Sequence, residues 1–118
     1  MSVTLPQEIE VWYIIPAIRR ELARAMLGTG LKQRDIAGIL GITEAAVSHY
    51  INSKRADYVK FSRGILEEIK RSADNIVKGG NVIMEIQRLC NICRKEGIVC
   101  RIGKMCGNVP RHCRVCFE

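Results

Sequence analysis

Six cysteines, all within the last 29 residues, are the side chains best able to do chemistry. Two C-x2-C pairs separated by 19 residues are typical of a four-cysteine zinc site, because each short loop lets two sulfurs reach one ion. Iron–sulfur clusters also take four thiolates, and their ligands need not come in pairs. Arginines and lysines interleave with these cysteines and favour the thiolate form. We therefore expect a metal centre built from some of Cys90, Cys93, Cys100, Cys106, Cys113 and Cys116.

Length and composition limit the rest of the chain. With 118 residues there is room for one domain, or one small domain with an appendage, and a large catalytic core is not expected. Only 5% of the residues are aromatic, so the core must consist of Ile, Leu, Val and Ala, which favours helices. No export signal and no apolar run of about 20 residues is present, so we expect a cytoplasmic protein without a membrane partner.

The net charge of +7 is unevenly distributed. Residues 1–59 contain seven basic and six acidic residues, whereas residues 60–118 contain twelve basic and six acidic residues. A basic chain attracts phosphate, which fits nucleic acid, although an anionic membrane surface would also attract it. In a reducing compartment, metal ligation by the cysteines is more plausible than disulfides.

Hydrophobic periodicity predicts five helical stretches: residues 7–27, 32–40, 44–53, 61–78 and 81–95. Pro16 lacks an amide hydrogen, so the first helix either kinks there or begins at Pro16 after a separate turn. In the last helix, Asn81 is the expected N-cap, and Ile83, Ile86 and Leu89 are expected to face inward. Beyond Gly97 the chain has few large apolar residues, so it should need a metal or a cross-link to hold its structure.

The second and third of these stretches fit a helix-turn-helix that begins at Gln33 and ends at Asn52. Its apolar positions are filled by Ile36, Ala37, Leu40, Ile42, Val47 and Tyr50. Gly41 permits the positive φ of a tight turn, and Thr43 can cap the second helix. Two amphipathic helices around a glycine are common in small helical proteins, but here the apolar pattern, the glycine and the cap all agree.

The second helix would leave short polar side chains on its outer face. Asn52 can pair with adenine, Ser48 and His49 can donate or accept hydrogen bonds, and Ala45 can contact a thymine methyl group. Glu44 could accept a hydrogen bond from cytosine, and Lys54 and Arg55 suit phosphates. The candidate DNA-contacting residues are Gln33, Thr43, Glu44, Ala45, Ser48, His49, Asn52, Lys54 and Arg55.

The stretch IIPAIRRELARAMLGTGLKQRDIAGILGITEAAVSHYINSKRA resembles the N-terminal domain of predicted archaeal transcriptional regulators of the lambda-repressor-like (XRE) class. The resemblance covers roughly residues 14–56, and GITEAAVSHYINSKR is its most specific part. It implies a compact bundle of four or five helices that is usually dimeric on a two-fold symmetric operator. The large ligand-binding domain that some of these regulators carry is not expected here, so a signal would act through residues 57–118.

The expected lack of a ligand-binding domain bears on which metal the cysteines would hold. A repressor without another effector domain needs an input, and an iron–sulfur cluster responds to oxygen, redox state or sulfur supply. We therefore expect a [4Fe-4S] cluster. The alternatives are a constitutive repressor or antitoxin-like module with a structural four-cysteine Zn²⁺ site, and a metal-free thiol–disulfide switch. Neither His112 nor His49 is expected to be a ligand.

The sequence thus predicts an all-α protein with a small irregular cysteine-rich tail. Its expected parts are a DNA-binding domain (1–58), connecting or dimerisation helices (59–89) and a metal-binding module (90–118). We expect a homodimer on an inverted-repeat operator in double-stranded DNA. No catalytic constellation is apparent, so an enzyme is not expected.

Overall fold

The computed structural model describes residues 5–52, 59–98 and 102, and within them it is all-helical, without a strand. The two helices of the expected helix-turn-helix lie in the middle of the sequence. The elements are α1 (Pro6–Ile9), the π-helical segment η1 (Glu10–Ile14), α2 (Ile15–Gly28), α3 (Gln33–Leu40), α4 (Glu44–Ile51), α5 (Arg63–Val77) and α6 (Val82–Lys95).

The first helix runs through Pro16 without a break. One π-helical turn precedes the proline, and there the Ile15 amide donates to the carbonyl of Glu10, five residues back. A proline inside an α-helix clashes with the carbonyl four residues before it, and a wider turn relieves this contact. The alternative left open by the sequence is therefore resolved: α1, η1 and α2 follow one another as a single helix with a local π distortion.

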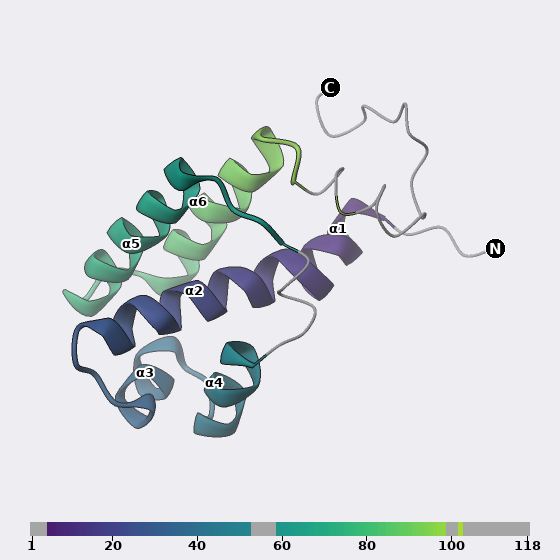
Figure 1. Cartoon of the computed structure of the whole chain (residues 1–118). Helices are drawn as coiled ribbons and strands as arrows, with labels where there is room; N and C mark the ends of the chain where they lie inside the picture. The colour runs from purple at the N-terminus through teal and green to yellow at the C-terminus, as the bar shows by residue number, and fades with distance from the viewer. Residues whose placement is uncertain (1–4, 53–58, 99–101, 103–118) are drawn as a thin grey trace.

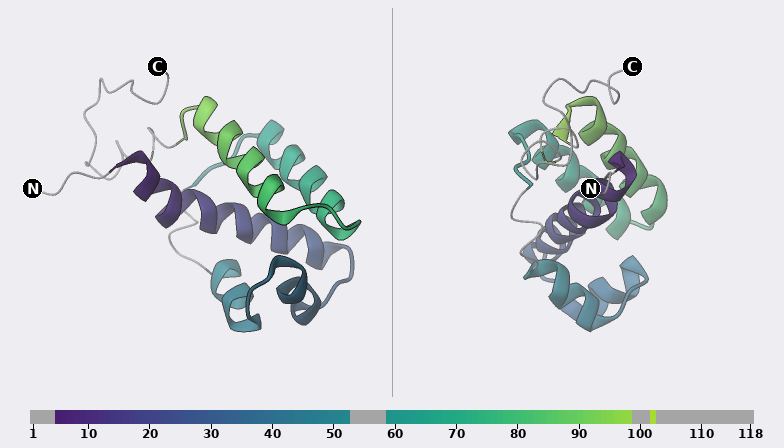
Figure 2. Two further views of the ribbon diagram at one scale, coloured as in Figure 1. Left: turned by 180° about the vertical axis from the view of Figure 1, so that it is seen from behind. Right: turned by 90° about the vertical axis from the view of Figure 1, so that its right-hand side faces the viewer.

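Helix α2 lies at the centre of the fold (Figure 1). Helices α3 and α4 pack against one side of α2, and the α5–α6 hairpin packs against the other. The views from behind and from the side show the same separation (Figure 2). The helix-turn-helix therefore projects from the bundle, and α5 and α6 leave it uncovered.

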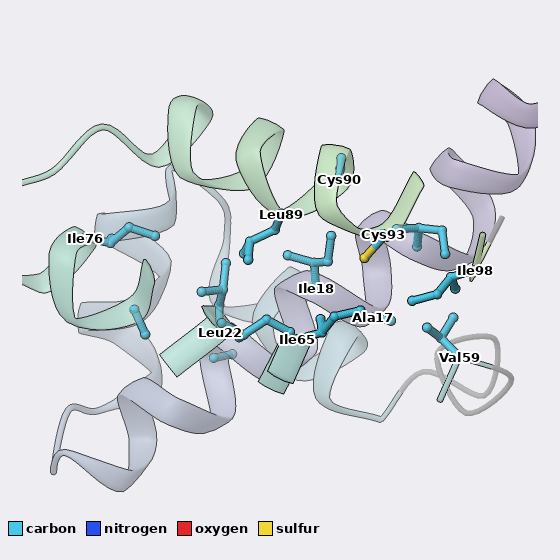
Figure 3. Close-up of a cluster of buried hydrophobic side chains, with 14 of the residues drawn as sticks. Ala17, Ile18, Leu22, Val59, Ile65, Ile76, Leu89, Cys90, Cys93 and Ile98 are labelled. Carbon is cyan, nitrogen blue, oxygen red and sulfur yellow. The ribbon is translucent and has the colours of Figure 1, made fainter. Parts of the chain in front are cut away.

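A single apolar cluster joins these elements (Figure 3). A buried stripe runs from the end of η1 along α2 and contains Ile14, Ile18, Leu22 and Met26, which recur every fourth residue and so share one helix face. The core members from the other described segments are Ile9, Ile36, Ala37, Val47, Val59, Ile65, Ile69, Ala73, Ile76, Leu89, Cys90, Cys93, Ile98 and Ile102. Ile65, Ile69, Ala73 and Ile76 share one face of α5, as the helical spacing of the predicted stretch 61–78 requires.

Helix α6 corrects one expectation. Asn81 caps it as predicted, accepting a hydrogen bond from the Met84 amide at 3.0 Å, but Ile83 is 73% exposed. The inward stripe instead begins one residue earlier, at Val82, and continues through Ile86 and Leu89. Both registers have helical spacing, so the apolar pattern alone does not distinguish them. Contacts between polar side chains of α5 and α6 fix the rotation.

Those polar contacts centre on Ser72, which is fully buried in α5. Its hydroxyl donates to Glu85 Oε1 at 2.8 Å and accepts a hydrogen bond from Arg88 Nη2. Arg88 also donates to Glu68 of α5, and this hydrogen bond lowers the pKa of the Glu68 carboxyl. Buried polar groups require such partners, so the network holds the two helices in one register.

The C-terminal end of α6 is joined to η1. Arg94 donates from Nε at 3.0 Å and from Nη2 at 2.8 Å to the same oxygen, Oε1 of the largely buried Glu10. The two residues are 84 positions apart in sequence, so this charge-assisted contact closes the bundle. Across the described ranges, the helices lack the length and the apolar character required to cross a bilayer.

Candidate nucleic-acid interface

The turn between α3 and α4 has the geometry that its sequence predicts. Gly41 adopts the left-handed conformation, with φ +71°, where a side chain would be strained. The next amide, from Ile42, donates to the carbonyl of Ala37 at 3.0 Å and closes the end of α3. Ile36, Ala37 and Val47 are buried between the two helices and α2, so the turn is held in one arrangement.

Thr43 begins α4 as its N-cap, and its hydroxyl accepts a hydrogen bond from the Ala46 amide at 3.0 Å. Replacing an N-cap hydroxyl with a methyl group leaves that amide unpaired and costs about 1 kcal/mol. We therefore expect Thr43→Ala to lower the free energy of unfolding by about 1 kcal/mol in urea denaturation. Thr43→Ser keeps the hydroxyl and is the matched control, so equal losses in the two variants would contradict this role of Thr43.

The outer face of α4 carries small or short side chains. Glu44, Ala45 and His49 are exposed, and Ser48 is half-buried. Asn52 is also exposed, but its amide nitrogen donates to the carbonyl of Ser48 at 2.9 Å, so this side chain folds back on its own helix. In a helix that enters the major groove, the N-terminal residues approach the base edges. Ala45 and Ser48 are therefore better placed than Asn52.

The other predicted contacts lie around this helix. Gln33 is the first residue of α3 and is exposed, as are Lys32 and Arg34 beside it. Lys54 and Arg55 lie outside the described residues, so their predicted phosphate contacts have no structural account. The surface brought together by the fold consists of the start of α3 and the exposed face of α4.

Sequence patterns miss one residue that positions α4. Arg19 of α2 donates to the Tyr50 hydroxyl at 2.6 Å, and its guanidinium carbon lies 5.2 Å from the centre of the Tyr50 ring. Cation–π contacts of this kind add to the hydrogen bond. The two residues are 31 positions apart, and no local sequence pattern indicates such a contact. Arg19 thereby joins the last turn of α4 to the central helix.

Two of the six cysteines lie in the described residues, one turn apart in α6. Both are free thiols, and Cys93 is completely buried with its sulfur directed into the core (Figure 3). Burial in apolar surroundings disfavours the thiolate and raises the pKa of Cys93 to about 12. It also raises the pKa of Cys90, with Glu10 adding to the effect. Both thiols are therefore neutral at physiological pH in this arrangement.

A metal bound to these thiols would have to displace their protons, as thiolate coordination does in general. Within the described ranges, no three His, Cys, Asp or Glu side chains are close enough together to hold a metal ion. The other four predicted ligands, Cys100, Cys106, Cys113 and Cys116, lie outside the described residues. The two helical cysteines can contribute at most two thiolates of a larger set.

The sequence and the fold were compared with known proteins. No match was found. The sequence matches no family model and no curated protein, and the fold matches no solved structure.

The charges of the helix-turn-helix and the helices before it balance. Residues 5–52 contain five basic and five acidic residues, so the net charge of +7 arises from the rest of the chain. Glu44, in the first turn of α4, suits the positive end of that helix dipole but would repel a nearby phosphate. The geometry of α4 therefore favours contacts to base edges, while the attraction to phosphate must come largely from other segments.

Proposed function

We propose that this chain is a sequence-specific DNA-binding transcriptional regulator that inserts α4 into the major groove of double-stranded DNA. One observation carries the proposal: α4 is capped, held by α2 and α3, and left open at the edge of the fold along a face where the short side chains of Ala45 and Ser48 lie. The major groove is wide enough to admit a helix, and bulky side chains on such a face would prevent close approach. This geometry supports readout by Ala45 and Ser48.

The regulator would act as a homodimer, because two-fold symmetric operators match two-fold symmetric proteins. Four large apolar side chains on α5 and α6 are exposed and could contribute to a subunit interface. They are Leu66, Val77, Ile83 and Met84. All four lie on the hairpin that packs on the opposite side of α2 from the helix-turn-helix, so pairing there leaves α4 of each subunit open.

The cysteine-rich segment would supply the input. We propose an iron–sulfur cluster, [4Fe-4S], held by four of the six thiols; its loss would alter the spacing of the two α4 helices. Two observations support this proposal. The chain contains six cysteines, and two of them, Cys90 and Cys93, lie near Arg94, whose guanidinium contacts Glu10 of η1. Preserved operator affinity after removal of the cluster would contradict this mechanism.

Anaerobic purification with iron, sulfide and zinc analysis tests the cofactor. We expect matching iron and sulfide contents and broad visible absorption, because cluster-bound thiolates absorb in this range. Stoichiometric zinc in a colourless protein would contradict the cluster and make the metal structural. Either result leaves the proposal of DNA binding untouched.

Selection of binding sites from a randomised pool of DNA duplexes tests DNA binding. We expect the pool to converge on an inverted repeat whose half-sites are about one helical turn apart, because two α4 helices must enter successive major grooves on one face. Recovery of unrelated sequences with no common site would overturn the proposal.

A further inference from the structure

An exposed apolar surface lies on the N-terminal helix, which is far from the cysteines in sequence. It consists of Leu5, Val11 and Trp12, which are 54%, 58% and 43% exposed. The other side of the same helix, with Ile9 and Ile14, is packed into the core. Exposed apolar residues grouped in this way mark contact sites, and we call them the Trp12 surface.

We propose that residues 103–118, the end of the cysteine-rich segment, dock on the Trp12 surface. The chain reaches this end of the fold through α6, whose Arg94 contacts Glu10, the residue directly before Val11. Ile98 and Ile102 are both buried in the same core cluster as Ile9 and Ile14, so the chain is anchored to the bundle just before the docking segment begins. In Figure 3, Ile98 and Val59 lie at the same end of the cluster as Cys93.

Length and charge also fit this occupant. Sixteen residues follow Ile102, and at about 3.3 Å per residue they can reach every part of α1 and η1. Residues 5–14 contain two glutamates and no basic residue, whereas residues 103–118 contain Lys104, Arg111, Arg114 and only one acidic residue. Val109, Val115 and Phe117 in the same segment can cover the apolar side chains.

A tethered segment fits this surface better than a second copy of the chain. A stable dimer buries about 800 Å² per partner, which is far more than three partly exposed side chains provide. A segment anchored at Ile102 has a high effective concentration and needs much less contact area. The proposal holds whichever metal the cysteines bind, and it does not depend on DNA binding.

Trp12 is the only tryptophan, so its fluorescence reports on this surface in the full chain. We expect Trp12 to be shielded from acrylamide, and we expect Val109→Ser/Phe117→Ser to raise its collisional quenching constant and shift its emission to longer wavelength. Asn108→Ser/His112→Ser changes two polar residues of the same segment and keeps its apolar side chains, so it should change neither quantity. Trp12 that is freely quenched in the unaltered chain would overturn the proposal. Shielding that persists in Val109→Ser/Phe117→Ser would overturn it too. So would shielding that is lost when the protein is diluted, because dilution separates a second copy of the chain but not a tethered segment.

The reciprocal experiment follows the docking segment itself. Val11→Ser/Trp12→Ser should increase the rate of tryptic cleavage after Arg111 and Arg114 by roughly tenfold, because cleavage follows the population of the undocked form. Circular dichroism would verify that the variant is folded. An unchanged cleavage rate in the folded variant would show that these side chains do not hold the segment.

Discussion

Ala45→Glu is expected to weaken binding to the selected operator at least about 100-fold, equivalent to roughly 2.7 kcal/mol. Ala45 is exposed in the first turn of α4, where a base edge or a phosphate would approach it. An added carboxylate there would be desolvated against a negatively charged groove. Near a helix N-terminus a negative charge is itself favourable, so the folded state should be as stable as that of the unaltered protein. Affinity would be measured by fluorescence anisotropy with labelled operator DNA.

Gln87→Glu is the matched control for this substitution. Gln87 is exposed on α6, on the other side of α2 from α4, and the variant changes the net charge by the same amount. We expect its affinity to remain within about threefold of the unaltered protein, because exposed charges beyond a Debye length are screened. Equal losses in both variants would mean that overall charge, and not α4, governs binding.

Leu22→Ala is expected to lower the free energy of unfolding by about 3 kcal/mol. Leu22 is fully buried in α2, the helix that contacts both the helix-turn-helix and the α5–α6 hairpin. Removing its side chain loses apolar burial and leaves a cavity that packed neighbours on both sides cannot fill. Since small domains are stable by only about 5–15 kcal/mol, the variant should unfold at much lower urea concentration. Circular dichroism during urea titration measures the change.

Leu66→Ala is the comparison for Leu22→Ala. It removes the same atoms from a leucine that is 37% exposed on α5, so we expect a loss below about 1 kcal/mol. Similar losses at Leu22 and Leu66 would contradict the central position of α2 in the fold.

Local features of the fold could be predicted from the sequence. The left-handed turn at Gly41 and the caps at Thr43 and Asn81 each depend on residues within four positions, and all three are confirmed. The five helical stretches are confirmed for the same reason, since apolar spacing reports directly on helix faces. Where two spacings fit equally, as for Val82 and Ile83, the sequence cannot choose, because packing against α5 decides.

Contacts between distant residues could not be predicted. The Arg19–Tyr50 and Glu10–Arg94 pairs each join two helices, and their geometry exists only once α2 is in place. The backbone conformation before Pro16 could not be predicted either. A π-helical turn relieves the clash of the proline ring there, so the helix continues through Pro16 and does not end. Nor could the burial of Cys93 be predicted, because it depends on the rotation of α6 about its own axis.

The central claim, that α4 reads bases, is tested most directly by repeating the binding-site selection with Ala45→Gln. Glutamine has the shape of glutamate without its charge, and it can form paired hydrogen bonds with adenine in the major groove. We predict that the preferred base changes at one symmetric position in each half-site, while the other positions and the spacing stay the same. A base preference that is identical at every position would contradict the insertion of α4 into the major groove.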